Sequence, residues 1–256
     1  MDKPLQPETA LNSWSRWNGE LRSRPIILKP LSGGRSNHSF LLDSDGKKMV
    51  LRLNGADTLL PGANRSSEIN IWQMASAQGI APPLLYVDNQ NRFLISTYIN
   101  NSLPPRPPID EIFVDQAFNL LKSFHQLDTD APTIDYASHI ENYWQIIERK
   151  SNLLNPVLNE QRKPIQEVLA TLTSSGTAMG LCHHDLVIAN FVGNADRLYL
   201  IDWEYAARGL QVMDYAALSF EWRIDDAVVI ERTGVELELL VMAKGFYRYL
   251  CALWCA

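Results

Sequence analysis

The chain has 256 residues, with 23 Lys and Arg against 29 Asp and Glu, so its formal net charge is -6. This acidic balance provides no basic surface for phosphate backbones or anionic lipids, which argues against nucleic acids and membranes as partners. No apolar run approaches the roughly 18–20 residues of a membrane span, and the N-terminus lacks a signal-peptide pattern. We therefore expect a cytoplasmic protein of one or two domains that acts on a small molecule.

Up to about residue 100, apolar and polar residues mostly alternate, which is typical of strands. An Asp45-Gly46 pair between two such runs indicates a hairpin. A helix is expected from Arg65 to Gln78, because its apolar residues have helical spacing and Gly79 suits a C-cap. The expected strands cover residues 26–28, 38–42, 49–53, 84–87 and 93–98.

A proline-rich stretch at 102–108 follows a joint between two lobes, because its prolines cannot continue a helix or a central strand. Beyond it, apolar residues recur at helical spacing. The expected helices lie around residues 113–124, 144–154, 168–172 and from 237 to the end, with a short strand at 198–201. The pattern predicts an α+β fold with a small β-rich N-terminal lobe, residues 1–99, and a larger, mainly helical C-terminal lobe, residues 100–256.

An unusual polar cluster follows Cys182. Asp185 precedes Asn190 by five residues, and Asp202 ends the next apolar run. Phosphoryl transfer needs a carboxylate that orients the attacking hydroxyl, and oxygen ligands that hold Mg²⁺ against nucleotide phosphates. Asp185 fits the first role, and Asn190 and Asp202 fit the second. A zinc site at Cys182 and the two histidines before Asp185 is less suitable, because adjacent residues rarely face one point.

The N-terminal part contains residues suited to nucleotide phosphates. Gly33 and Gly34, followed by Asn37, lie between two expected strands, where glycines let backbone N–H groups approach phosphates closely. Arg52, on the third strand, is the candidate cation for the phosphates, and Glu68 is its helical partner. Read alone, these features would also fit a hairpin turn and a surface ion pair. Their order along the chain favours a nucleotide site.

The H-x-D-x-x-x-x-N spacing, followed by an apolar strand and Ile201-Asp202-Trp203-Glu204, resembles the aminoglycoside phosphotransferase and choline kinase superfamily. The resemblance covers most of the chain and is greatest to the choline/ethanolamine kinase and thiamine kinase branches. It implies a protein-kinase-like fold, with residues 1–99 as the nucleotide-binding lobe and 100–256 as the catalytic and acceptor-binding lobe.

The same resemblance implies individual roles. Asp185 is the catalytic residue, Asn190 and Asp202 hold Mg²⁺, and Asp214 braces the catalytic loop. The adenine ring of ATP lies against main-chain groups at Thr97, Tyr98 and Ile99. The residues placed around the acceptor alcohol are Asp185, Glu204, Tyr205, Glu221, Trp222 and Trp254.

Aromatic faces and a carboxylate are the groups that bind a quaternary ammonium, and they would also accept the cationic ring of thiamine. Choline kinases resemble the chain up to a Trp-x-x-Trp helix, where Cys251 here occupies the first position and Trp254 the second. They usually continue beyond the point at which Ala256 ends this sequence. The two tryptophans, Trp222 and Trp254, would equally fit core packing.

These observations predict an ATP- and Mg²⁺-dependent kinase that phosphorylates the primary hydroxyl of a small cationic metabolite, with choline or ethanolamine first. Thiamine kinase is the nearest alternative, followed by an aminoglycoside phosphotransferase. A truncated, non-catalytic nucleotide-binding homologue is the last alternative. The oligomeric state, monomer or homodimer, stays open.

Overall fold

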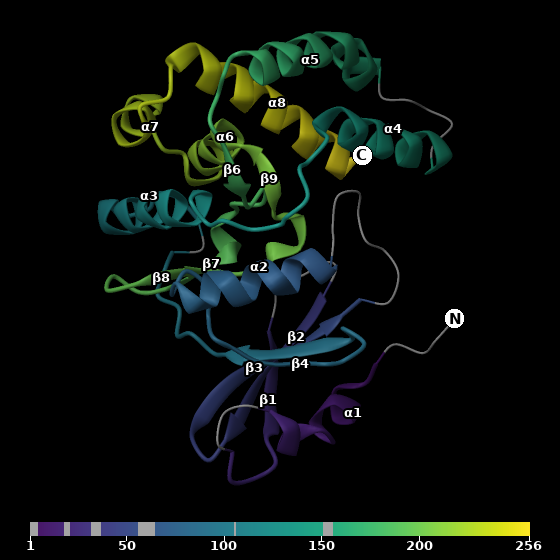
Figure 1. The fold of residues 1–256 in the computed structure, drawn as a ribbon, viewed down its shortest axis with the longest axis vertical. Helices are drawn as coiled ribbons and strands as arrows, with labels where there is room; N and C mark the ends of the chain where they lie inside the picture. Colours follow the sequence, from purple (N-terminus) through teal and green to yellow (C-terminus); the bar gives the residue numbers. More distant parts are fainter. Residues whose placement is uncertain (1–4, 18–20, 32–36, 56–64, 105, 151–155) are drawn as a thin grey trace.

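The computed structural model describes residues 5–17, 21–31, 37–55, 65–104, 106–150 and 156–256. A β-rich part and a larger helical part are stacked along the long axis of the molecule, with the N-terminal sheet at one end (Figure 1). The expected α+β architecture of two lobes is confirmed. Gly33 and Gly34 lie outside the described residues.

The N-terminal part is built on an antiparallel sheet with strand order β1-β2-β3-β5-β4. Asp45 and Gly46 connect β2 to β3 at φ values of 52° and 83°, the left-handed region that a tight hairpin requires. Helix α1 (Pro7–Leu11) covers one face of the sheet, and α2 (Arg65–Ala77) lies between the sheet and the helical part (Figure 1). The strands are β1 (Ile26–Leu31), β2 (Asn37–Ser44), β3 (Lys47–Asn54), β4 (Leu84–Val87) and β5 (Phe93–Thr97).

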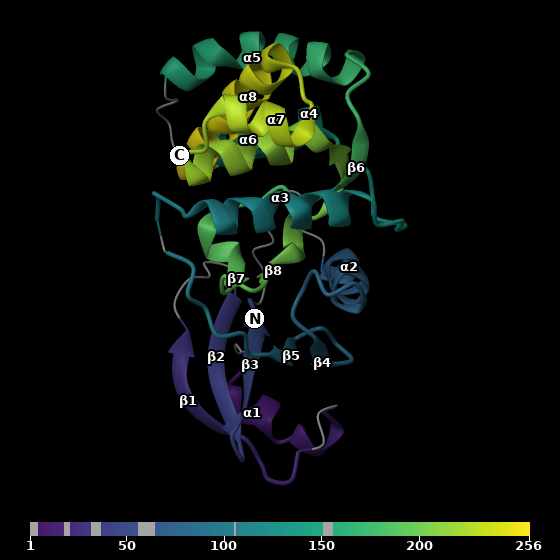
Figure 2. The same ribbon diagram turned by 90° about the vertical axis from the view of Figure 1, so that its left-hand side faces the viewer.

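The C-terminal part is mainly helical and encloses two small antiparallel ribbons, β6 with β9 and β7 with β8. Helix α3 runs across the middle of the molecule, and the other large helices stack beyond it (Figure 2). None of the described helices is long and apolar enough to cross a bilayer. The helices are α3 (Glu111–His125), α4 (Tyr136–Lys150), α5 (Pro156–Ser174), α6 (Gln211–Trp222), α7 (Asp226–Thr233) and α8 (Leu237–Cys255). The strands are β6 (Met179–Cys182), β7 (Phe191–Gly193), β8 (Leu198–Leu200) and β9 (Ala207–Leu210).

Four of these helices, α3, α4, α5 and α8, confirm the sequence pattern. Helices α6 and α7 were not expected. Most residues of α6 are buried, so it lacks the polar face that marks an amphipathic helix in a sequence. Helix α7 is only eight residues long, which is too short to establish a clear period.

The apolar core continues across the predicted joint. Ile71 and Trp72 of α2 and Leu94 of β5 belong to the same buried cluster as the helices of the C-terminal part. A second, smaller cluster lies where Leu11 and Trp17 pack against the sheet. The division between residues 99 and 100 therefore stays a prediction, since no break in the core accompanies it.

Candidate active site

The loop after β6 carries Asp185, and a 3-10 turn, η2 (Ile188–Asn190), returns Asn190 to it. Asn190 Nδ2 donates hydrogen bonds to the main-chain oxygen of Asp185 at 2.9 Å and to its Oδ2 at 2.8 Å. These two bonds orient the carboxylate and turn the amide oxygen of Asn190 away from it. The segment from Asp185 to Asn190 is thus held as one unit.

Asp214, near the start of α6, holds this loop in place by hydrogen bonds. Its carboxylate accepts the main-chain N–H groups of His183 and His184, each at 2.9 Å, and lies 3.0 Å from His125 Nε2. Although burial opposes ionisation, the hydrogen bond and charge of His125, the charge of His184 and the amide of His183 keep the pKa of Asp214 below its usual range. These contacts are those expected of a residue that braces the loop.

His183 connects the loop to the chain before Asp202. Its ring donates from Nε2 to the carbonyl of Ile201 at 3.1 Å, and the amide of Ile201 donates to the carbonyl of Asn190 at 2.9 Å. The expected alternative of a zinc site at Cys182, His183 and His184 is not assembled. Cys182 instead lies beside His125 and Asp214, where Asp214 is already occupied by hydrogen bonds.

Asp202 follows β8 in a left-handed conformation, φ 67° and ψ 65°, which turns its carboxylate toward the N-terminal part. Burial, and next the charge of Asp202, raise the pKa of Asp185 to about 7. Burial raises the pKa of Asp202 to about 6, against the opposing effect of Arg52. Two carboxylates that are costly to ionise together, beside an amide oxygen of Asn190, are the hard oxygen set that a divalent cation stabilises.

Arg52 of β3 provides a buried cation on the other side of Asp202. Its Nη1 donates to Glu68 Oε1 at 2.6 Å and lies 3.5 Å from Asp202 Oδ1. Its Nε and Nη2 are buried and have no hydrogen-bond partner among the described residues. Because a buried donor without a partner is costly, these two nitrogens fit the oxygens of an incoming phosphate.

A second cation, Arg65 at the first residue of α2, was missed by the sequence analysis. It donates from Nη1 to Glu68 at 3.1 Å and to Glu204 at 3.0 Å, and from Nη2 to Asn37 at 2.8 Å. Its position three residues before Glu68 was the available signal. Glu204 belongs to this network, 5% exposed, and does not line the acceptor pocket as expected. The turn at η3 (Trp203–Tyr205) directs it toward α2 instead.

The residues expected at the adenine ring follow the end of β5. The amide of Thr97 donates to the carbonyl of Pro83 at 2.9 Å, and that of Tyr98 donates to the carbonyl of Lys48 at 3.2 Å. Both amides are therefore already engaged, one by the residue before β4 and the other by β3. The main-chain hydrogen bonds of the described residues leave the amide of Ile99 as a donor for a ligand.

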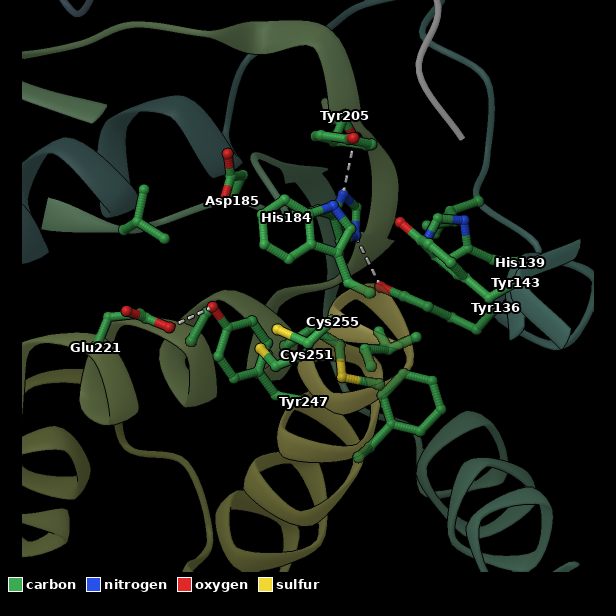
Figure 3. Close-up of a pocket in the computed structure, with 17 residues that line it drawn as sticks. Tyr136, His139, Tyr143, His184, Asp185, Tyr205, Glu221, Tyr247, Cys251 and Cys255 are labelled. Atoms are coloured by element: carbon green, nitrogen blue, oxygen red, sulfur yellow. Dashed lines mark hydrogen bonds between the residues drawn. The ribbon is translucent and has the colours of Figure 1, made fainter. Parts of the chain in front are cut away.

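On the far side of Asp185 lies a cavity of about 400 Å³ (Figure 3). Of the expected acceptor residues, Asp185, Tyr205, Glu221 and Trp254 line it. Glu221 accepts a hydrogen bond from the hydroxyl of Tyr247 at 2.9 Å. The lining residues that the sequence analysis missed come mainly from α4 and α8; those that carry polar, aromatic or thiol groups are Tyr136, His139, Tyr143, His184, Phe246, Tyr247, Cys251 and Cys255.

The two tryptophans have different environments. Trp254 lines the cavity and is 40% exposed, so it is accessible to a ligand. Trp222 is 2% exposed, and its ring packs edge-on against Phe191 with 4.7 Å between centroids. The structure therefore does not bring Trp222 to the acceptor cavity. It fills the core because it lies on the opposite side of α6 from that cavity.

Comparison with known proteins agrees with this geometry. The model of the phosphotransferase enzyme family matches residues 27–239, a range that contains Arg52, Asp185 and Asp202. The chain belongs to the phosphotransferase enzyme family. This match confirms the family resemblance that the sequence motifs indicated.

The individual relatives are distant in sequence. Protein LicA of Haemophilus influenzae is 25% identical over 191 residues, which are 73% of this chain and 56% of that protein, so the chain spans little more than half of that relative. Choline kinase LicA from Streptococcus pneumoniae has a similar fold, with a TM-score of 0.75, 22% identity, and coverage of 90% of this chain and 85% of the other. A structure of LicA in complex with AMP gives a TM-score of 0.73 at 21% identity, covering 97% and 88% of the two chains.

Proposed function

We propose that this protein is an ATP- and Mg²⁺-dependent kinase that phosphorylates the primary hydroxyl of a small cationic alcohol, with choline or ethanolamine as the first candidates. One observation carries the proposal. Asp185 lies between a buried ionic network suited to phosphates and an aromatic cavity that contains a second carboxylate, Glu221. A hydroxyl bound at Asp185 would therefore face a nucleotide on one side and leave its cationic end in the cavity.

The nucleotide side has donors for phosphate and adenine. Nε and Nη2 of Arg52, which have no partners among the described residues, would contact phosphate oxygens, and Asn190 and Asp202 would hold Mg²⁺. Gly33, Gly34 and the main chain at Ile99 would complete the site. The AMP complex of the structurally similar LicA supports nucleotide binding at this fold. Because the reaction uses ATP, we also propose that the protein works in the cytoplasm.

Catalysis in this proposal depends on positioning. Asp185 would accept a hydrogen bond from the alcohol and take its proton as the alcohol oxygen bonds to the γ-phosphorus of ATP, while the bond from that phosphorus to the bridging oxygen breaks and ADP leaves. Asn190 keeps the carboxylate in place, and Arg52, held by Glu68, stabilises charge on the phosphate oxygens. Bound ATP would supply the phosphoryl group, and bound Mg²⁺ would neutralise part of its negative charge.

The cavity favours a compact cation over a large polyamine. Aromatic faces from Tyr143, Tyr205 and Trp254 attract an alkylated ammonium, and Glu221 supplies the balancing charge. An aminoglycoside carries several ammonium groups and would need more carboxylates than this lining contains. Thiamine, with one primary hydroxyl and one cationic ring, has chemistry similar to that of choline and stays the second candidate.

The proposal is tested by following ADP release from ATP and Mg²⁺ with choline, ethanolamine, thiamine or kanamycin, with the Asp185→Ala variant in parallel. We expect release with one of the first three alcohols and none from the variant. ADP release with kanamycin alone would show that the substrate is an aminoglycoside and not a small cationic metabolite. Nucleotide binding without release for any alcohol would favour a non-catalytic homologue.

A further inference from the structure

We propose that His184 is a positioning residue whose ring fixes the distance between Asp185 and the aromatic wall that binds the cationic end of the alcohol. The inference rests on the proposed function and deepens it. His184 precedes Asp185 directly and lines the same cavity, yet neither the phosphoryl-transfer motif nor the acceptor chemistry requires a histidine there.

The backbone of His184 is in an unfavourable conformation. Its φ is 63°, in the left-handed region where residues with a Cβ are disfavoured and Gly or Asn are more common. The hydrogen bond from its amide to Asp214 holds this conformation and requires no particular side chain. A large ring at such a position is therefore accounted for by what the ring itself contacts.

The ring joins two separate segments of the cavity wall. His184 Nδ1 lies 3.2 Å from the main-chain oxygen of Tyr205, and Nε2 lies 2.9 Å from the hydroxyl of Tyr136 (Figure 3). A carbonyl oxygen can only accept, so Nδ1 carries the proton. Nε2 of the neutral ring then accepts from the Tyr136 hydroxyl, whose oxygen accepts the amide of Leu210 at 3.1 Å. Each donor in this chain of hydrogen bonds has one acceptor.

Two further observations indicate that the ring stays neutral and fixed. Burial lowers the pKa of His184 below its ordinary value, although Asp214 acts in the opposite direction. The pair also packs directly on the backbone of Gly209, where a Cβ would lie 2.5 Å from the Tyr136 hydroxyl and 2.7 Å from His184 Nε2. Any side chain at this position of β9 would displace the pair.

The consequence concerns the length of the acceptor. Tyr136 is the first residue of α4, which also supplies His139 and Tyr143 to the cavity, and Tyr205 is a wall residue itself. A short alcohol has a fixed separation between its hydroxyl and its cation. We call the hydrogen-bonded unit of His184, Tyr136 and the Tyr205 carbonyl the strut. Because the strut sets the separation of Asp185 from both walls, its loss should misplace the hydroxyl of the alcohol. Among the described residues, no hydrogen bond joins the strut to Arg52, Glu68 or Asp202.

The test compares His184→Asn with Tyr136→Phe. Asn tolerates the left-handed backbone but is too short to span both partners, and Phe removes only the hydroxyl. We expect kcat/KM for the alcohol to fall roughly 10- to 100-fold in each variant, with KM for ATP unchanged. The double variant should lose little more than either single one, since both changes break the same strut.

Tyr249→Phe is the matched control. The Tyr249 hydroxyl is also buried, accepts from Trp144 Nε1 at 3.0 Å and donates to the Leu158 carbonyl at 3.2 Å, away from the cavity. It should lower thermal stability without changing KM for the alcohol. Equal fractional losses of kcat in Tyr136→Phe and Tyr249→Phe, with every KM unchanged, would show a structural role only and overturn the inference.

A second measurement does not depend on turnover. Long-range ¹H–¹⁵N spectra of the histidine side chains should show Nδ1 of His184 protonated and Nε2 unprotonated, with the Nε2 signal altered in Tyr136→Phe. A proton on Nε2 in the wild-type protein would refute the strut even if the kinase is active. If the wild-type protein phosphorylates no alcohol, the proposed function fails and the spectrum alone decides the strut.

Discussion

The two sides of Asp185 are built from different interactions. On the side where we propose that the nucleotide binds, Arg52 and Arg65 form a buried ionic network with the carboxylates that they contact. On the cavity side, where we propose that the alcohol binds, aromatic rings dominate, and the carboxylate of Glu221 is held by a tyrosine hydroxyl. The phosphate groups of all nucleotides are negatively charged and have the same tetrahedral geometry, so a rigid ionic site suits them. The proposed alcohol would be recognised by its shape and its single positive charge, and aromatic rings bind a cation with less desolvation cost than buried carboxylates do.

The largest effect on activity is expected at Asp185, which lies between the two sides. Asp185→Ala should lower kcat about 10²- to 10⁴-fold, because the proton of the alcohol loses its acceptor. Nucleotide affinity should change little, since Arg52 and Asp202 remain. Steady-state turnover and a separate ATP titration measure the two effects. Lost ATP affinity with retained turnover would contradict the role assigned to Asp185.

The ionic side should be sensitive to the removal of one partner. Arg52→Ala leaves Glu68, which is completely buried, without its closest cation, so the free energy of unfolding should fall by about 3–5 kcal/mol. Urea denaturation measures this loss. Arg52→Lys retains a charge but not the fork, and it should lose less stability while raising KM for ATP. A loss below about 1 kcal/mol in Arg52→Ala would show that the network is not essential to the fold.

The carboxylate of Asp185 should also make the stability of the protein depend on pH. Because the folded-state pKa of Asp185 is about 7, well above its ordinary value, its contribution to stability is complete at low pH and is lost as pH rises toward 7. Asp185→Asn should therefore stabilise the metal-free protein at pH 8, on the order of 2 kcal/mol, and much less at pH 4.

Comparing this variant with the wild type at each pH isolates the Asp185 contribution. The buried His183, with a pKa of about 4, has the opposite effect on the free energy of unfolding. Its contribution to the stability of the protein is lost as pH falls. Thermal melts without Mg²⁺ at a series of pH values provide the data. A stability difference that does not grow with pH would contradict the raised pKa.

The smallest effect is expected on the aromatic side. Trp254→Leu removes a ring that faces the cavity, and it should weaken binding of a cationic alcohol by about 0.5–2 kcal/mol, with stability nearly unchanged. The acceptor KM measures this change. Trp222→Leu is the control, and it should lower stability and leave the acceptor KM alone. The reverse outcome would exchange the roles that the structure assigns to the two tryptophans.

Much of the fold and of the nucleotide side could be predicted from the sequence. Strand alternation and the Asp45-Gly46 turn are local signals, and Asp185 and Asn190 lie five residues apart within one loop. Helix α6 escaped because a helix buried on most sides has no amphipathic period. Glu204 was assigned to the acceptor because its motif gives its place in the chain and not the direction of its side chain.

The sequence by itself determined the loop from Asp185 to Asn190, the order of the two parts and the residue types that the proposed phosphate chemistry uses, because these depend on short spacings and local backbone preferences. Only the tertiary structure decided that Arg65 meets Glu204 across 139 residues, that Trp254 and not Trp222 faces the cavity, and that Tyr136 reaches His184. These contacts join distant helices and turns, and their geometry is fixed by packing, which no local pattern records.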